Sequence, residues 1–152
     1  MGIEFLKLGR HQLDQKLKAW QPLRDQEMPG GGWLRAVRTS LGLTAAALAK
    51  RLGVTPATLS DLEHSEAGGT ITLNSLRKAA AAMDCKVVYA IVPRTSLDAI
   101  LERKALEKAR AMLGHVGHSM ELEAQAVEPL QARQQAKALA QTLLANPKSL
   151  WK

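Results

Sequence analysis

The side chains best placed to do chemistry are hydroxyl, carboxylate and imidazole groups between residues 44 and 70. The sequence has no phosphate-binding loop, no carboxylate cluster with metal-ligand spacing and no nucleophile paired with a base. What remains is hydrogen bonding, because hydroxyls both donate and accept, and a carboxylate accepts from amino groups. The pattern therefore predicts a binding protein and not an enzyme, with no metal site and no cofactor.

These groups fall on a run of four predicted helices, at about residues 33–41, 44–52, 55–64 and 72–83. Each predicted start has a residue suited to cap a helix, and these caps are Gly32, Thr44, Thr55 and Thr72. Pro56 follows its cap directly, at the first helical position, where proline is tolerated best.

The second and third of these helices have the spacing of a helix-turn-helix. Ala49 is small where the two helices cross, and Gly53 permits the positive φ that a sharp turn needs. Val54, Leu59 and Leu62 are expected to face a shared core. In such a unit the start of the second helix enters the major groove of DNA.

Five residues then lie nearest the base edges. They are Thr55, Pro56, Ala57, Ser60 and Asp61. Ala57 suits a thymine methyl, and Ser60 or Asp61 accepts from an amino group, but none makes a bidentate contact to guanine or adenine. Shape readout and phosphate contacts must then carry more of the affinity. For Asp61, simple exposure to solvent is the alternative.

A second set suits phosphate oxygens, because it combines hydroxyls, helix N-termini, positive charge and backbone N–H groups expected to be bare. The predicted phosphate-facing residues are Thr44, Thr58, His64, Gly68, Gly69, Thr70, Arg35 and Arg77.

Residues 33–83 resemble the lambda-repressor-like, Xre-type helix-turn-helix family. The resemblance is carried by the helix-turn-helix itself, the lead-in from Arg38 to Thr44 and the closing helix from Leu73 to Met83. It implies that Arg38 and Glu63 form an internal salt bridge that belongs to the scaffold. The family usually has Gln where this chain has Ala45, so one expected DNA contact is missing.

Charge and cysteine content are consistent with a DNA-binding protein. The chain has 21 Lys and Arg against 14 Asp and Glu, a net charge of +7 that attracts polyanions. The charge is spread along the chain, so solvated helix faces explain it equally well.

Cys85 is the only cysteine, which excludes an intrachain disulfide, and no apolar run is long enough to cross a membrane. We expect a cytoplasmic protein with no membrane partner.

One segment reads as a β-strand. Residues 86–93 are β-branched and aromatic and end at Pro93. A single strand cannot satisfy its own N–H and C=O groups, so it predicts pairing with the same strand of a second copy across a two-fold axis. A homodimer of this kind requires a palindromic operator. Pairing with another short strand of the same chain is the alternative.

The sequence thus predicts a mainly α protein in four parts. Residues 1–28 form an N-terminal helical arm, residues 32–85 the lambda-repressor-like helix-turn-helix bundle, residues 86–93 the dimerising strand and residues 94–152 a C-terminal helical extension. In the extension, one helix is expected to begin at Ser96 and end near Gly114 and Gly117. Another runs from about residue 119 to residue 146, and Pro129 either kinks it or opens a new helix.

Taken whole, the chain resembles the family called mobile mystery protein A. The motifs that carry this resemblance are Gly32 to Arg38, Glu66 to Leu73, Val88 to Pro93, and His118 to Glu123. It implies a Fic-domain toxin as partner, with this chain as its DNA-binding antitoxin and autoregulator. The alternative is a free-standing Xre-type repressor whose C-terminal region senses a ligand or braces the dimer.

A possible toxin-inhibitory motif goes with this resemblance. Ser119 and Glu123 have the Ser/Thr-x-x-x-Glu spacing of Fic inhibitors, although Ala124 departs from the motif. A plain N-cap at Ser119 followed by acidic residues explains the same pattern. His115 and His118 are expected to be loop residues and not half of a metal site.

Overall fold

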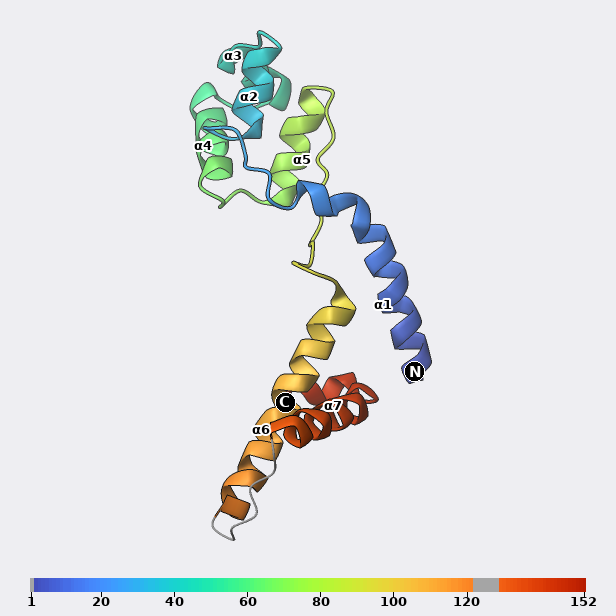
Figure 1. Ribbon diagram of the computed structural model, residues 1–152. Coiled ribbons are helices and arrows are strands. Elements are labelled where there is room, and N and C mark those ends of the chain that lie inside the picture. The colour runs from blue at the N-terminus through green and yellow to red at the C-terminus, as the bar shows by residue number, and fades with distance from the viewer. Residues whose placement is uncertain (1, 122–128) are drawn as a thin grey trace. The chain divides into compact units, whose positions relative to one another are not determined.

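The computed structural model describes residues 2–121 and 129–152, and this part of the chain contains helices and no strand. It divides into two compact units (Figure 1). One unit is Pro22–Ala90, and the other joins Met1–Gln21 to Ile91–Lys152. The arm and the extension, separate segments in the sequence, therefore belong to one unit.

The unit Pro22–Ala90 holds the four helices expected from the sequence. They are α2 (Trp33–Ser40), α3 (Ala45–Leu52), α4 (Pro56–Ala67) and α5 (Leu73–Ala82). The three threonine caps form as expected, because the hydroxyls of Thr44, Thr55 and Thr72 each accept the N–H of the residue three positions later. Gly53 ends α3 in the left-handed region with a φ of 68°.

The core of this unit is small and made almost wholly of aliphatic side chains. Leu48 and Leu59 are completely buried, and Ala49 is 1% exposed where α3 meets α4. The other buried members of the cluster are Leu34, Ala79 and Met83. Truncating either leucine to alanine should cost about 2–5 kcal/mol. One face of α4 therefore packs against this core, and the opposite face is exposed.

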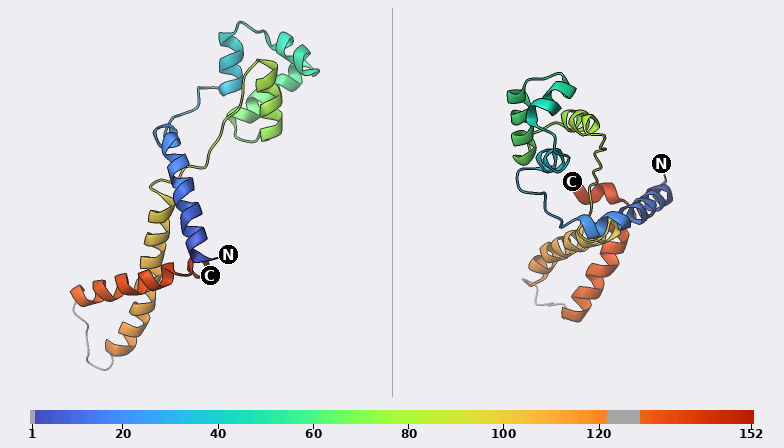
Figure 2. Two further views of the ribbon diagram at one scale, coloured as in Figure 1. Left: turned by 90° about the vertical axis from the view of Figure 1, so that its right-hand side faces the viewer. Right: turned by 90° about the horizontal axis from the view of Figure 1, so that it is seen from above.

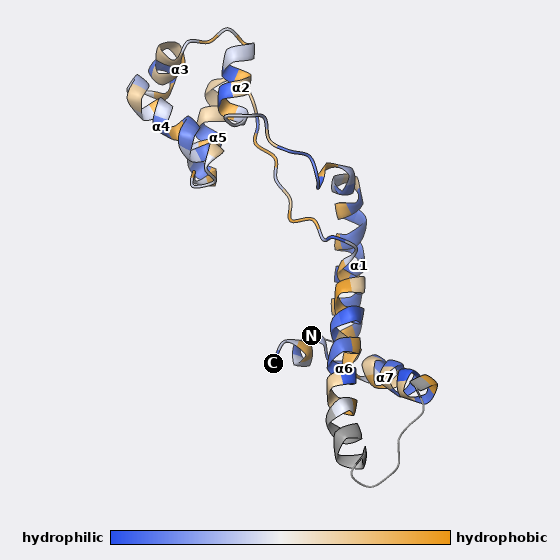
Figure 3. Cartoon of the chain, turned by 60° about the vertical axis from the view of Figure 1, so that its left-hand side comes forward, coloured by the Kyte–Doolittle hydropathy of each residue, from blue (hydrophilic) through white to orange (hydrophobic). Residues whose placement is uncertain are grey.

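The predicted dimerising strand over residues 86–93 is wrong. Residues 85–93 have no regular secondary structure, although Figure 3 colours much of this segment as hydrophobic. A strand exists only when its N–H and C=O groups are paired, and strand propensity depends on the neighbours that a segment finds. Val88, Tyr89 and Ile91 are instead exposed. The class stays mainly α, without the strand.

The second unit is built from α1 (Ile3–Leu17), most of η1 (Lys18–Leu23), α6 (Leu97–Glu121), α7 (Pro129–Leu144) and η2 (Pro147–Trp151). Helix α7 crosses α6 (Figure 2), and small residues line the crossing. Ala105, Ala109 and Ala140 are buried there with Leu101 and Leu150. Alanine leaves room for close helix approach, so this core holds despite the scarcity of aromatic residues.

One boundary in this unit differs from the prediction, and the structure decides another that the sequence left open. Helix α6 continues through Gly114 and Gly117 to Glu121, so Ser119 lies inside a helix and is not an N-cap. Each interior glycine costs only about 1 kcal/mol relative to alanine, too little to end a helix by itself. Of the two alternatives for Pro129, the structure has the second, because α7 begins there.

The start of α6 is capped by α1. The Asp14 carboxylate accepts the backbone N–H groups of Leu97 and Asp98 at 2.8 and 3.3 Å. Ser96 caps the same turn through the N–H of Ala99, and Arg10 forms an ion pair with Asp98. These contacts attach α1 to α6 although no α1 side chain is buried. None of the described helices is both long enough and apolar enough to span a membrane.

Candidate nucleic-acid interface

The residues predicted to face DNA bases form one exposed face at the start of α4. Pro56, Ala57, Ser60 and Asp61 are all exposed, whereas Leu59 between them is fully buried. Thr55 is exposed as well and caps the helix. The structure therefore brings all five residues together, on a helix that is anchored from behind.

A capping threonine uses its hydroxyl oxygen as an acceptor and keeps its O–H hydrogen as a donor. Thr44 Oγ1 accepts the N–H of Ala47 at 3.1 Å and is exposed, so its O–H hydrogen stays available to a phosphate oxygen. Thr55 Oγ1 accepts the N–H of Thr58 at 3.1 Å and lies 2.9 Å from Thr58 Oγ1. One hydroxyl of that pair donates to the other. The pair therefore offers one free O–H donor and not two.

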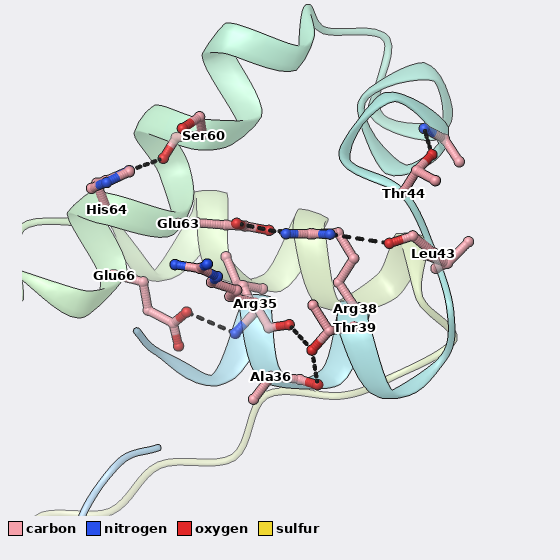
Figure 4. A network of polar contacts seen from close by, with 12 residues as sticks. Arg35, Ala36, Arg38, Thr39, Leu43, Thr44, Ser60, Glu63, His64 and Glu66 are labelled. Atoms are coloured by element: carbon pink, nitrogen blue, oxygen red, sulfur yellow. Dashed lines mark hydrogen bonds and ion pairs between the residues drawn. The ribbon is translucent and has the colours of Figure 1, made fainter. Parts of the chain in front are cut away.

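His64 lies further along α4, on its exposed side. Its Nδ1 is 2.7 Å from the backbone carbonyl oxygen of Ser60 (Figure 4), and because a carbonyl only accepts, Nδ1 must carry the hydrogen. The remaining nitrogen, Nε2, accepts a hydrogen bond when the ring is neutral and donates one when the ring is protonated. His64 thus suits a phosphate only in its protonated form.

The loop after α4 does not offer the bare amides expected from the sequence. The N–H groups of Gly68, Gly69 and Thr70 donate to the carbonyls of His64, Glu66 and Ser65, at 2.9, 3.0 and 2.7 Å. The expectation is wrong in this respect, because the chain closes the end of α4 on itself. The Thr70 hydroxyl also donates to the Ser65 carbonyl, at 3.4 Å.

Arg38 and Glu63 form the internal pair that holds α2 against α4. Arg38 Nε and Nη2 donate to the two carboxylate oxygens of Glu63 at 2.5 and 3.0 Å, and Nη1 donates to the Leu43 carbonyl at 3.1 Å (Figure 4). The two side chains are 12% and 9% exposed. The hydrogen bond and the charge of Glu63 raise the pKa of Arg38 above its ordinary value, against the opposing effect of burial. The guanidinium of Arg38 therefore belongs to the scaffold.

Glu66 is a second scaffold residue, and sequence reasoning missed it. Its buried carboxylate accepts the N–H groups of Trp33 and Leu34 at 3.0 and 2.8 Å, so α4 caps the start of α2. Gly32, the expected cap, contributes no side chain but makes room. A Cβ on it would lie 2.8 Å from Glu66 Oε2, and its φ is +93°. A capping residue so far away in sequence leaves no local signal.

Positive charge is scarce around this face. No Lys or Arg occurs between residues 52 and 76, a range that includes all of α4, whereas Asp61 is exposed there. The predicted phosphate contacts Arg35 and Arg77 lie on α2 and α5, and both are exposed. The guanidinium of Arg77 also stacks 5.5 Å above the ring of Tyr89. Any charge attraction to a polyanion must come from residues outside α4.

The predicted toxin-inhibitory pair cannot be placed. Glu123 lies outside the described residues, and the same holds for the side chain of Ser119 and those of His115 and His118. Among the residues that are described, no group of His, Cys, Asp or Glu is arranged to hold a metal ion.

Comparison with known protein families identifies the unit that carries this face. Residues 34–89 match the helix-turn-helix family model, of the Xre type. No curated protein and no solved structure matches the chain. The matched residues therefore form a helix-turn-helix domain, which supports a DNA-binding transcription regulator. The resemblance to mobile mystery protein A has no counterpart in these matches.

Proposed function

We propose that the protein is a sequence-specific transcriptional repressor that reads its operator with the exposed face of α4. The observation that carries this proposal is the position of Ala57, Ser60 and Asp61 on one open face of a helix whose opposite face is anchored by Leu59. A rigid helix that presents short side chains fits closely into the major groove.

We further propose that two copies bind a palindromic site. The reason is that a single α4 face discriminates weakly between DNA sequences. This reason does not depend on a dimerising strand. The α4 face offers no bidentate reader and no Lys or Arg, so one half-site supplies little discrimination. A second copy adds the free energy of a second half-site and thereby multiplies the specificity.

The test is a charge introduced at the start of α4. Ala57→Glu places a carboxylate in the first turn, where the helix dipole favours it, so the fold should be kept. In the major groove the same carboxylate meets the negative field of DNA. We expect operator binding by the full-length protein, measured by fluorescence anisotropy, to fall at least about tenfold, which is 1.4 kcal/mol.

A matched control introduces the same charge elsewhere. Gln131 is exposed in the first turn of α7, in the other unit. Gln131→Glu therefore adds the same negative charge as Ala57→Glu, and adds it in the same first turn of a helix. This variant should bind DNA with no more than about a twofold loss. Equal losses in the two variants would mean that net charge, and not the α4 face, determines binding.

Within this function, the antitoxin role is the finer proposal. The support for it is the resemblance of the four sequence motifs to mobile mystery protein A, which implies a Fic-domain partner and autoregulation of the shared operon. Co-expression with a Fic-domain protein encoded beside it should give a complex that copurifies. A free-standing repressor, the alternative, would elute without that protein and still bind its operator.

A further inference from the structure

The helix-turn-helix unit contains a cavity whose lining includes none of the predicted DNA contacts. It lies against α2, α5 and the segment 85–88, and its volume is about 460 Å³. This is within the range of small-molecule sites, roughly 300–1,000 Å³. Its walls are mainly apolar, with Trp33, Val37, Leu76, Met83 and Val88 among them. Such walls favour a ligand with a hydrophobic body.

Two charged residues on the cavity wall decide which polar group the ligand carries. Glu66 is buried, and both of its carboxylate oxygens already accept backbone N–H groups, so it needs no further donor and repels an anion placed beside it. Lys86 is exposed and has no ion-pair partner in the part of the chain that the structure describes. Its ammonium group is therefore free to bind an anion at the rim.

We propose that this cavity binds an amphiphilic carboxylate, with the apolar body against Trp33 and Met83 and the carboxylate on Lys86. The consequence for DNA binding rests on the proposed function. Glu66 belongs to α4 and caps α2, so a ligand there contacts the residue that joins these two helices. It also neutralises Lys86. Both effects lower the affinity for the operator.

Cys85 makes the binding measurable without DNA. It is the only cysteine of the chain, it is exposed, and it lines the same cavity. The rate at which neutral iodoacetamide alkylates Cys85 in the full-length protein can be followed by mass spectrometry, with decanoate, decanol or decylammonium added below micelle-forming concentrations. Decanoate should slow the reaction saturably, and it should do so at lower concentrations than either of the other two.

Lys86→Gln is the matched variant, and it changes an exposed side chain, so the fold should be kept. It should weaken protection by decanoate about tenfold, which is 1.4 kcal/mol, and leave protection by decanol unchanged. Protection by decylammonium equal to that by decanoate would overturn the choice of an anion. An unchanged decanoate effect in Lys86→Gln would also overturn the choice of an anion. Absence of protection by all three compounds would overturn the cavity as a binding site.

Operator binding is then measured separately, with and without decanoate. We expect saturating decanoate to lower the affinity at least about fivefold, the smaller end of typical coupling between two sites. Cys85 protection with unchanged operator affinity would overturn the regulatory coupling alone. Cys85 protection in a protein that never binds its operator would instead refute the proposed function and leave the site standing.

Discussion

Removing Arg38 tests how the α4 face is held in place. The variant Arg38→Met keeps most of the length of the side chain and deletes its charge. Glu63 is then left buried with an unpaired carboxylate, and the Leu43 carbonyl loses the donor that lay 3.1 Å away. The double variant Arg38→Met/Glu63→Leu removes the charge of Glu63 as well.

The magnitudes follow from burial. Leaving one buried charge without its partner costs about 3–5 kcal/mol, and the lost bond to Leu43 about 1 kcal/mol. A small domain has only about 5–15 kcal/mol of stability, so Arg38→Met should bring this unit close to unfolding. The double variant leaves no buried charge unpaired, and we expect it to lose only about 1–2 kcal/mol.

Urea unfolding measures these losses if one fluorophore reports on this unit. The chain has three tryptophans, and a background of Trp20→Phe and Trp151→Phe leaves Trp33 on α2 as the reporter.

Because the pKa of Arg38 is raised, its charged form is the one that folding stabilises. That contribution is complete below the pKa of arginine in the unfolded chain and is lost only as the pH rises through the folded value. The losses should therefore be equal at pH 7 and pH 9. A double variant as unstable as Arg38→Met, or a loss below about 1 kcal/mol in Arg38→Met itself, would mean that the Arg38–Glu63 pair does not hold α2 against α4.

Three further outcomes are expected. Gly32→Ala should destabilise the helix-turn-helix unit by about 1–2 kcal/mol more than Gly31→Ala. Both positions have positive φ, but only the Cβ at 32 comes within 2.8 Å of Glu66; equal losses in urea unfolding would contradict this. Two phosphate-facing arginines per copy predict a slope of log K against log salt of about −3.6 for a dimer, and Arg77→Gln should reduce it by about 1.8; an unchanged slope would exclude Arg77 as a phosphate contact. Asp14→Ala should cost about 1–2 kcal/mol by uncapping α6 and should speed proteolysis of α1; unchanged proteolysis would mean that this cap does not hold the arm.

The helix-turn-helix was predictable because its signals are local. Thr44, Thr55 and Thr72 each cap a helix through a residue three positions on, and Gly53 adopts the left-handed turn that its position requires. Short-range patterns of this kind depend little on the rest of the chain. The five residues predicted to face DNA bases are exposed in the structure, and their contact with bases stays a prediction.

Two of the features that were missed depend on residues far apart in the sequence. Glu66 caps α2 from more than 30 residues away, and Asp14 caps α6 from more than 80. The amides of the loop after α4 are satisfied by its last turn, a detail of geometry that composition does not reveal. The predicted strand failed for a related reason, since β-branched residues favour a strand only where a partner strand exists.

Selection from a random pool of DNA duplexes measures whether the α4 face reads DNA sequence. The full-length protein should enrich a palindrome with half-sites about one helical turn apart, roughly 10–10.5 base pairs or a multiple of this. Ala57→Glu should abolish that enrichment, and Gln131→Glu should preserve it. No enriched sequence with the wild-type protein, or the same sequence enriched by Ala57→Glu, would mean that the α4 face does not read DNA sequence.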